Sequence, residues 1–320
     1  MAEPPFFEPM LATLTNDYFS SDDWIYEPKL DGERCIAVKK NGKVTLMSRN
    51  KRIINIEYPE LAQALADQKA DNFIIDGEIV ALDKNGVSDF RLLQSRINLQ
   101  DAAAIKYHVQ QTPVRYCIFD VTYADNYDLR GLDLLARKTI LKKLLDYNDV
   151  LMYVDHQSPD GITYFKKACR LGWEGLIAKK SDSTYVGARS RNWLKFKCAV
   201  SQELIIVGYT DPQGSRTDFG ALLVGYYDDK KLMYAGKVGS GFSHAVLKML
   251  GKKLRAREIK TCPVGNYALS TRSVHWVKPE LVAEFKFAQW TGKNRLRVPR
   301  YQGLRDDKSA QDVIKEKPAK

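Results

Sequence analysis

Short stretches of alternating hydrophobic and polar residues, separated by turn residues, dominate the first 200 positions of the chain. This alternation predicts β-strands that are buried on one face. CIAVKK and KVTLMS flank Asn41-Gly42, which predicts a β-hairpin with a two-residue turn. Segments with helical spacing or continuous apolar character complete the pattern. They predict helices at 58–68, 133–145 and 162–172, and strands at 73–82, at 115–123 and in GLIAKK and WLKFK.

The pattern changes near residue 201, where strands shorten and turns become frequent. QELIIVGYT, ALLVGYY and KLMYAGKVG read as strands, a basic amphipathic helix is predicted at 243–257, and strand character resumes in HWVKPELVAEFKFAQW. Several short strands with one interposed helix are typical of a small Greek-key barrel of the OB type. We therefore expect a mixed α+β domain at 1–200 and a β-domain at 201–320, whose polar tail from 309 onward is expected to be frayed.

Net charge separates these two domains. The chain carries +11, from 50 Lys and Arg and 39 Asp and Glu. Residues 201–320 contain 22 basic and 12 acidic residues, a net of +10, which leaves +1 for the first 200 residues. A basic domain beside a neutral one favours a polyanionic partner such as nucleic acid, although a solvated basic surface would have the same composition.

Targeting and cysteine signals are weak. The sequence has no apolar run near the roughly 20 residues of a membrane span. MAEPPFFEPM also lacks the charged and apolar regions of a secretory signal. The five cysteines are scattered and form no CxxC pair, so we expect neither a zinc site nor a disulfide, as in a reducing cytoplasm.

The segment IYEPKLDGERCIAV, residues 25–38, places Lys29 where its neighbours favour burial. The local motif is Lys-x-Asp-Gly-x-Arg. A lysine becomes a nucleophile when its surroundings lower its pKa. Gly32 would let the backbone approach a ligand, Arg34 would supply a fixed donor to a phosphate or ribose, and Asp31 would orient and solvate the amine. The alternative is a surface lysine with a long stem.

Further charged or aromatic motifs follow along the chain. Taken singly, each has a simpler interpretation as a turn, a core residue, a half-exposed strand or a charged tail. They are Ser48-Arg49-Asn50, Asp76-Gly77-Glu78, the Tyr-Cys-Ile-Phe-Asp at 116–120, the Glu-Gly-Leu-Ile-Ala-Lys at 174–179, Lys195-Phe196-Lys197 and Arg305-Asp306-Asp307-Lys308.

In type and order, these motifs resemble those of the covalent nucleotidyltransferase superfamily of ATP-dependent DNA ligases, RNA ligases and mRNA capping enzymes. In that family the lysine attacks the α-phosphate and carries the nucleoside monophosphate as a phosphoramide. The resemblance implies an α+β nucleotidyltransferase (adenylation) domain with antiparallel sheets flanked by helices, followed by an OB-fold β-barrel. It implies ATP, with AMP carried on Lys29, and Mg²⁺, with Mn²⁺ as an alternative.

The resemblance also implies a role for each motif residue. Lys29 would be the nucleophile. Nucleotide binding would fall to Glu27, Arg34, Glu78, Phe119, Lys195 and Lys197. Metal binding would fall to Glu78 and Glu174, and contact with the 5′-phosphate of the nicked strand to Arg49. Closure of the barrel onto the leaving pyrophosphate would involve Arg305, Asp307 and Lys308.

Over nearly its whole length the chain is similar to the ligase domain of the bacterial ligase D type, which acts in nonhomologous end joining. Further similar segments are 7–12, 208–216, 234–242 and 297–308. Leu30 stands where that type often has tryptophan, and Glu33-Arg34 is similar to larger eukaryotic ligases. Because no polymerase, nuclease or separate helical DNA-binding domain accompanies the core, we expect a minimal ligase that grips DNA with two domains.

The expected function is sealing of 5′-phosphate/3′-hydroxyl nicks in duplex DNA through lysyl-AMP and DNA-adenylate, in DNA repair. An RNA ligase, a GTP-dependent capping enzyme and a non-catalytic DNA-binding module are the alternatives. Nicked duplex DNA and end-joining or repair proteins are the expected partners. We expect a monomer of the bacterial cytoplasm or nucleoid, without membrane association.

Overall fold

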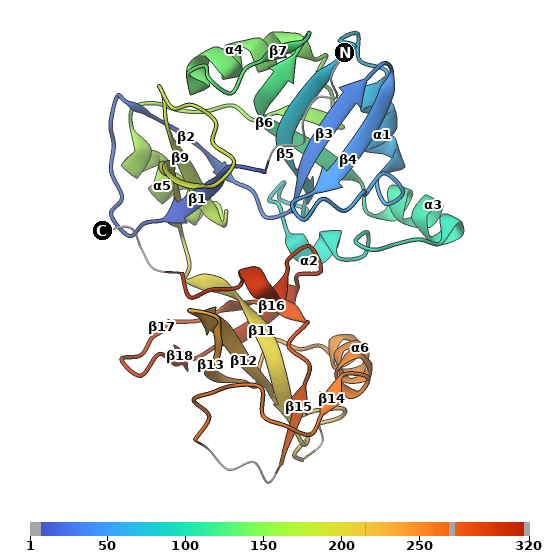
Figure 1. Ribbon diagram of the computed structural model, residues 1–320, viewed down its shortest axis with the longest axis vertical. Helices are drawn as coiled ribbons and strands as arrows, with labels where there is room; N and C mark the ends of the chain where they lie inside the picture. Colours follow the sequence, from blue (N-terminus) through green and yellow to red (C-terminus); the bar gives the residue numbers. More distant parts are fainter. Residues whose placement is uncertain (1–7, 215, 269–272, 317–320) are drawn as a thin grey trace. The chain divides into compact units, whose positions relative to one another are not determined.

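The computed structural model describes residues 8–214, 216–268 and 273–316 (Figure 1). The chain forms two compact units, which are treated separately below. Among the described residues, unit 1 comprises 8–198 and unit 2 comprises 199–316.

The first sheet of unit 1 is mostly antiparallel and has the strand order β4-β3-β5-β6-β7, with β8 added in parallel to β6. Asn41 and Gly42 join β3 to β4 with φ values of 50° and 76°, as a two-residue hairpin turn requires, so the predicted hairpin is confirmed. The strands are β3 (Glu33–Lys40), β4 (Lys43–Ser48), β5 (Phe73–Ala81), β6 (Val114–Ala124), β7 (Tyr127–Asp128) and β8 (Leu151–Tyr153).

The second sheet of unit 1 has the order β1-β10-β9-β2. Its strands are β1 (Leu11–Leu14), β2 (Trp24–Lys29), β9 (Gly175–Lys180) and β10 (Arg189–Lys197). Helix α5 (Gly161–Arg170) packs on this sheet, because Tyr164, Phe165 and Ala168 share one buried cluster with Tyr26 and Phe196. Strands β9 and β10 run antiparallel, and β1 continues the sheet parallel to β10.

The remaining helices of unit 1 cover the first sheet or its loops. The expected helices at 58–68 and 133–145 are α1 (Pro59–Ala66) and α4 (Leu134–Leu144). The sequence analysis missed α2 (Phe90–Leu93) and α3 (Ala102–Gln111). The side chain of Asp101 caps α3 by accepting a hydrogen bond from the amide of Ala104, so an acidic cap before an alanine run was the available signal.

Two buried clusters hold unit 1 together around the first sheet. The larger one fills the space between this sheet, α1 and α4, with Leu61, Phe73 and Leu141 fully buried. The smaller cluster contains Phe119 of β6 and Trp193 of β10, and therefore joins the two sheets. Arg34, Glu78 and Phe119 lie on strands of the first sheet, which these clusters fix in place.

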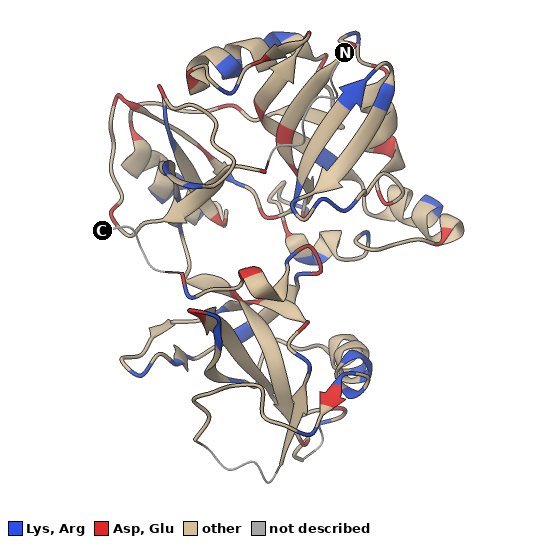
Figure 2. Ribbon diagram, viewed as in Figure 1, with Lys and Arg blue, Asp and Glu red and all other residues tan. Residues whose placement is uncertain are grey.

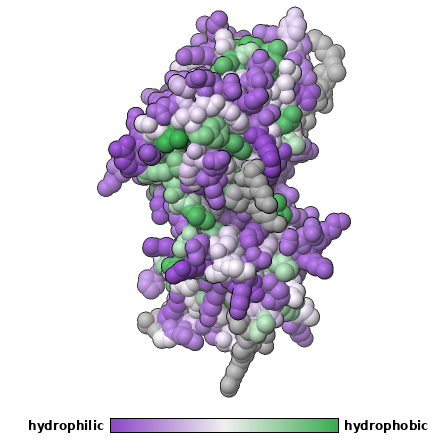
Figure 3. Space-filling model, turned by 90° about the vertical axis from the view of Figure 1, so that its left-hand side faces the viewer, coloured by the Kyte–Doolittle hydropathy of each residue, from purple (hydrophilic) through white to green (hydrophobic). Residues whose placement is uncertain are grey.

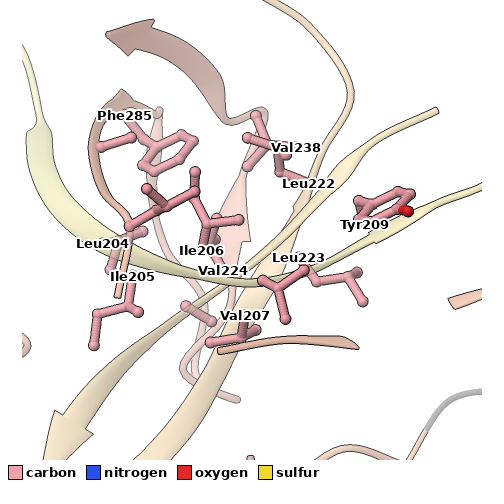
Figure 4. Packing of buried hydrophobic residues seen from close by; sticks show 14 of the residues in the cluster. Leu204, Ile205, Ile206, Val207, Tyr209, Leu222, Leu223, Val224, Val238 and Phe285 are labelled. Atoms are coloured by element: carbon pink, nitrogen blue, oxygen red, sulfur yellow. The ribbon is translucent and has the colours of Figure 1, made fainter. Parts of the chain in front are cut away.

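Unit 2 is built around the long strand β11, which pairs with β12 on one side and with β15 and β16 on the other. Leu204, Ile205, Ile206 and Val207 of β11 are all fully buried, which explains the continuous apolar run in the sequence (Figure 4). The strands are β11 (Ser201–Thr210), β12 (Leu222–Asp228), β13 (Lys231–Val238), β14 (Glu258–Ile259), β15 (Val274–Val277), β16 (Val282–Lys286), β17 (Gln289–Trp290), β18 (Leu296–Arg297) and β19 (Arg300–Leu304).

The end of unit 2 differs from the predicted frayed tail. A short 3-10 helix, η1 (Ala310–Asp312), precedes Val313, which is 6% exposed and accepts a hydrogen bond from the amide of Tyr227. The amide of Glu316 donates to the side chain of Gln202 at 3.2 Å. The prediction was wrong for residues 309–316, because one apolar side chain and backbone pairing hold this polar segment. Residues 317–320 lie outside the described part of the chain.

The cysteine prediction was also wrong. Cys169 of α5 and Cys198, which follows β10, form a disulfide with a Cα–Cα distance of 5.3 Å. The two residues are 29 positions apart and share no motif, so only the packing of α5 on the second sheet brings them together. Cys35, Cys117 and Cys262 are free thiols.

The surface is mainly hydrophilic on the face shown in Figure 3, where apolar residues form small separate groups. Lys and Arg residues recur along α6 (His244–Arg255) of unit 2, where the ribbon of Figure 2 is coloured blue, as the predicted basic helix requires. Among the helices of the described residues, none combines the length and the apolar character that crossing a membrane would demand.

Candidate active site

Lys29 is the last residue of β2 and lies at a point where three strands of the second sheet run side by side. It pairs with Gly175 of β9, and Gly175 pairs on its other side with Lys197 of β10. Gly175 has a φ of 154°, and a Cβ atom there would lie 1.8 Å from the carbonyl oxygen of Phe196. A glycine is therefore needed for the three strands to place Lys29 and Lys197 on either side of it.

The Lys29 amine contacts a carboxylate directly. Its Nζ lies 2.5 Å from Oε2 of Glu174, with the two side chains 19% and 16% exposed. Burial acts to lower the pKa of Lys29, but Glu174, supported by Asp31, outweighs both burial and the nearby Lys197 and raises it. The sequence left this balance open, and in the structure it favours the protonated amine.

Gly32 packs closely against strand β5. A Cβ atom at Gly32 would lie 2.1 Å from the carbonyl oxygen of Ile79 and 3.0 Å from Cγ of Glu78. The absent side chain therefore lets the turn after Lys29 lie against Glu78, and the approach of a ligand to this backbone stays a prediction. Asp31 holds the other side of this turn, since its amide donates to Oγ of Ser88 at 3.0 Å.

Arg34 is fixed in a single orientation. Its Nε and Nη2 donate to Oδ1 and Oδ2 of Asp76 at 2.5 and 2.6 Å, and Nη2 also donates to the carbonyl oxygen of Met10. Tyr185 donates its hydroxyl to Asp76 as well, at 2.6 Å. The guanidinium carbon lies 4.7 Å from the centre of the Phe119 ring, which places a cation beside the aromatic expected to stack on the purine.

Glu27 is 2% exposed and lies between two lysine side chains. Its carboxylate forms ion pairs with Lys138 and with Lys179, the latter at 2.6 Å. Burial acts to raise the pKa of Glu27, but the two lysines lower it overall. Nζ of Lys179 also lies 4.3 Å from the ring centre of Phe119 and 4.1 Å from that of Trp193, and burial lowers its pKa.

The other expected residues occupy neighbouring positions in unit 1. Lys195 lies two residues before Lys197 on β10, so both side chains point to the same face. Glu78 of β5 stands opposite Arg34 of β3. Arg49 follows β4 in a turn and is partly buried.

The described residues contain no group of three or more His, Cys, Asp or Glu side chains placed to hold a metal ion. Glu174 beside Lys29 and Glu78 beside Gly32 offer two separate carboxylates instead. Mg²⁺ usually takes one or two carboxylates and completes its shell with water and phosphate oxygens. The donor set therefore fits Mg²⁺ bound together with a nucleotide better than an ion bound by the protein alone.

Arg305, Asp307 and Lys308 belong to unit 2, where they follow β19. Nε and Nη2 of Arg305 each donate to an oxygen of Asp307 at 2.9 Å. Lys308 lies 3.6 Å from Glu203. Both side chains of the Arg305–Asp307 pair are buried.

Several residues of the site were missed by sequence reasoning. Lys179 and Asp76 lay inside quoted motifs but received no role. Lys138 sits on the helix α4 with 1% exposure and pairs with a residue 111 positions away, so its local sequence carries no signal. Trp193 likewise joins Phe119 only through the packing of the two sheets, with ring centres 6.0 Å apart.

Comparison with protein families gives two matches in sequence order. Residues 9–197 match the ATP dependent DNA ligase domain, and residues 215–308 match the ATP dependent DNA ligase C terminal region. The fold class expected from the sequence is therefore confirmed as an α+β nucleotidyltransferase-type ligase fold followed by an OB-fold domain. Among the described residues, the ladders of unit 2 follow an open path from β13 to β14.

Individual proteins agree with the family matches. The chain is 37% identical over 99% of its length to the "multifunctional non-homologous end joining protein LigD" of Pseudomonas aeruginosa, and 33% identical to that of Mycolicibacterium smegmatis over 98%. It spans 37% and 40% of these two proteins, respectively. It is also 32% identical to a "DNA ligase" of Sulfolobus acidocaldarius, covering 90% of this chain and 53% of that protein.

Two solved structures are similar along almost their whole length. A mycobacterial DNA ligase D complexed with ATP and MES has a TM-score of 0.67 and 32% identity, with 96% of this chain and 98% of that one covered. The ligase domain of Mycobacterium tuberculosis LigD has a TM-score of 0.51 and 33% identity, with 97% and 98% covered.

Proposed function

Because the chain belongs to the family of ATP-dependent DNA ligases, we propose that it seals nicks in duplex DNA through an AMP group carried on Lys29. The observation that supports this most directly is the pairing of Gly175 with Lys29 on one neighbouring strand and with Lys197 on the other, together with the contact between Glu174 and the Lys29 amine. A non-catalytic DNA-binding module would not need a partly buried lysine, a carboxylate and a second lysine at one point of a sheet.

The reaction would begin with attack of Lys29 Nζ on the α-phosphorus of ATP. Because Glu174 keeps the amine charged, the amine must first lose its proton to solvent water. The N–P bond then forms as the bond to pyrophosphate breaks, and pyrophosphate leaves. Lys195 and Lys197 would neutralise the α-phosphate, which is the main task of a phosphoryl-transfer site. Mg²⁺, held by Glu78 and Glu174, would supply further positive charge to the phosphates.

Nucleotide recognition would use the region where the two sheets of unit 1 pack against each other. Phe119 offers an aromatic face, Glu27 an acceptor for the purine edge, and Arg34 a fixed donor toward ribose or phosphate. In this arrangement Lys138 and Lys179 keep Glu27 ionised, so it can only accept hydrogen bonds. The amino group of adenine would satisfy it, whereas the oxygen of guanine at the same position would not.

The later steps would use the nick itself. AMP passes from Lys29 to the 5′-phosphate, which Arg49 would contact, and the 3′-hydroxyl then displaces AMP to form the phosphodiester. We propose that residues 1–200 carry the adenylation chemistry and that residues 201–320 bind DNA phosphates with their net charge of +10. Arg305, Asp307 and Lys308 would approach the pyrophosphate when the second domain closes.

The context proposed for this activity is DNA repair, since two relatives carry non-homologous end joining in their names. Because the chain spans less than half of those proteins, its partners are proposed separately: nicked duplex DNA, and end-joining or repair proteins. We propose that it acts as a monomer. Light scattering at several protein concentrations, with and without nicked DNA, would test this, and a concentration-dependent mass would contradict it.

The decisive experiment incubates the protein with α-labelled ATP and Mg²⁺, and then adds nicked duplex DNA. We expect a label that survives denaturation, disappears in Lys29→Ala, and is discharged as the nick is sealed. Lys69→Ala is a matched control, because Lys69 is 91% exposed and lies 3.7 Å from Asp146 at the surface. Labelling by GTP alone would favour a capping enzyme, and a folded protein that takes up neither label would refute the proposal.

A further inference from the structure

Two glutamates face each other across neighbouring strands of unit 2. Glu203 of β11 stands directly opposite Glu284 of β16 in the antiparallel ladder. Like charges in such directly opposite positions destabilise a sheet unless cations compensate them. Both side chains are largely buried, at 27% and 12% exposure, so water screens their repulsion only in part.

The compensating cations are Arg305 and Lys308. Nη1 of Arg305 lies 3.8 Å from Oε2 of Glu284, and Nζ of Lys308 lies 3.6 Å from Oε1 of Glu203. The backbone fixes this arrangement, because the amide of Arg305 donates to the carbonyl oxygen of Val282 at 2.8 Å. The two cations are thus held against the paired strands β11 and β16.

Asp307 completes the cluster with a third carboxylate. It makes two hydrogen bonds of 2.9 Å to Arg305, which is 8% exposed at its side chain. Burial acts to lower the pKa of Arg305, but Asp307, Glu203 and Glu284 together raise it. Three carboxylates therefore surround two cations, and Arg305 remains charged in its buried position.

We propose that Glu203 and Glu284 are positioning residues that compete with the phosphates of ATP for Arg305 and Lys308. This inference rests on the proposed function, in which the same two cations approach the leaving pyrophosphate. A cation cannot be fully paired with the sheet and with a phosphate at once, so each adenylation requires the cluster to open. The carboxylate pair then recaptures the cations and favours release of pyrophosphate.

Removing one carboxylate should make it easier for Arg305 and Lys308 to leave the cluster and bind the phosphates of ATP. Partly exposed ion pairs contribute up to about 1 kcal/mol, so we expect the KM for ATP in lysyl-AMP formation to fall roughly twofold to fivefold in Glu284→Gln. Inhibition by added pyrophosphate should strengthen by a similar factor. The maximal rate of label transfer to Lys29 should change little. A lower KM is a gain that damage to the fold would not produce.

The experiment measures single-turnover labelling of the full chain over a range of ATP concentrations. Glu284→Gln and Glu203→Gln are the tests, and thermal unfolding confirms that each variant is folded. Glu284→Asp keeps the charge and should restore the original KM. Glu280→Gln is the matched control, because Glu280 is 57% exposed and pairs with Arg257 away from the cluster. Its KM should be unchanged.

The outcomes separate this inference from the function on which it rests. If the unaltered chain forms no lysyl-AMP, both the function and the inference fail. If it does, and a folded Glu284→Gln or Glu203→Gln variant has an unchanged or higher KM, only the competition is overturned. Should Glu284→Gln not fold, the more exposed Glu203→Gln decides the matter alone.

Discussion

Glu27 offers the sharpest test of how the site is built, because its carboxylate is assigned to purine recognition and also holds two buried lysines. Replacing it with glutamine keeps its shape and removes its charge. The change leaves Lys138 and Lys179 at 1% exposure without their shared counter-ion. Breaking a buried ion pair in this way typically costs 3–5 kcal/mol.

The lower end of that range is expected for Glu27→Gln. Burial lowers the pKa of Lys179, so this lysine can lose its proton more readily than an ordinary lysine and avoid part of the penalty. We therefore predict a loss of about 3 kcal/mol in the free energy of unfolding of unit 1 at about pH 7. For a unit of this size, that corresponds to a fall of roughly 6–12 °C in Tm.

The stability that Glu27 contributes should depend on pH. The folded-state pKa of Glu27 lies below its ordinary value of 4.5, so its stabilising contribution is complete above that value and is lost as the pH falls through the folded pKa. The difference between the original chain and Glu27→Gln should therefore be full near neutral pH and shrink in acid. Urea unfolding followed at several pH values would measure it.

Asp128→Asn is the control for this series, since Asp128 pairs with Arg130 at the surface of unit 1 with half of its side chain exposed. Surface pairs of this kind contribute at most about 1 kcal/mol. A Glu27→Gln variant that loses no more stability than Asp128→Asn would refute the account of Glu27 as a buried counter-ion. Discrimination between ATP and GTP, measured by labelling, would then show whether purine recognition alone explains this residue.

Three further predictions follow from the same geometry. Gly175→Ala should lower the free energy of unfolding by about 2 kcal/mol or more and abolish labelling of Lys29, because its Cβ would meet the Phe196 carbonyl. Gly131→Ala is the control, because a Cβ there meets nothing within 4 Å and its φ is not positive, and equal losses in urea unfolding would contradict the packing argument. Cys169→Ser should lower the free energy of unfolding by roughly 3–4 kcal/mol, since the disulfide closes a loop of 29 residues. The difference from the original chain should vanish when both proteins are unfolded in reductant, and a difference that persists in reductant would show that loss of the disulfide is not its cause. Because Glu174 raises the pKa of Lys29, the single-turnover rate of labelling should increase from about pH 6 to about pH 9, and a rate that is constant or decreases over this range would argue against loss of the Lys29 proton before attack.

Local patterns in the sequence were sufficient to predict most elements of the fold. The Asn41-Gly42 hairpin, the helices α4, α5 and α6, and the central strands β5, β6 and β11 all follow from residue spacing and turn chemistry, which act between near neighbours. The motif residues were identified differently, because the order of their short segments resembles that of the ligase family, whereas each segment taken singly has a simpler interpretation.

Only the tertiary structure decided how these residues act on one another. Lys29 and Glu174 are 145 positions apart, and no local pattern indicates that the carboxylate would outweigh burial and keep the amine protonated. The same holds for Lys138 on Glu27 and for the disulfide between Cys169 and Cys198. Spacing along the chain determines which face of a strand or helix a side chain occupies. Pairing energies depend on distance and burial, which exist only once the two sheets of unit 1 and the strands of unit 2 have packed.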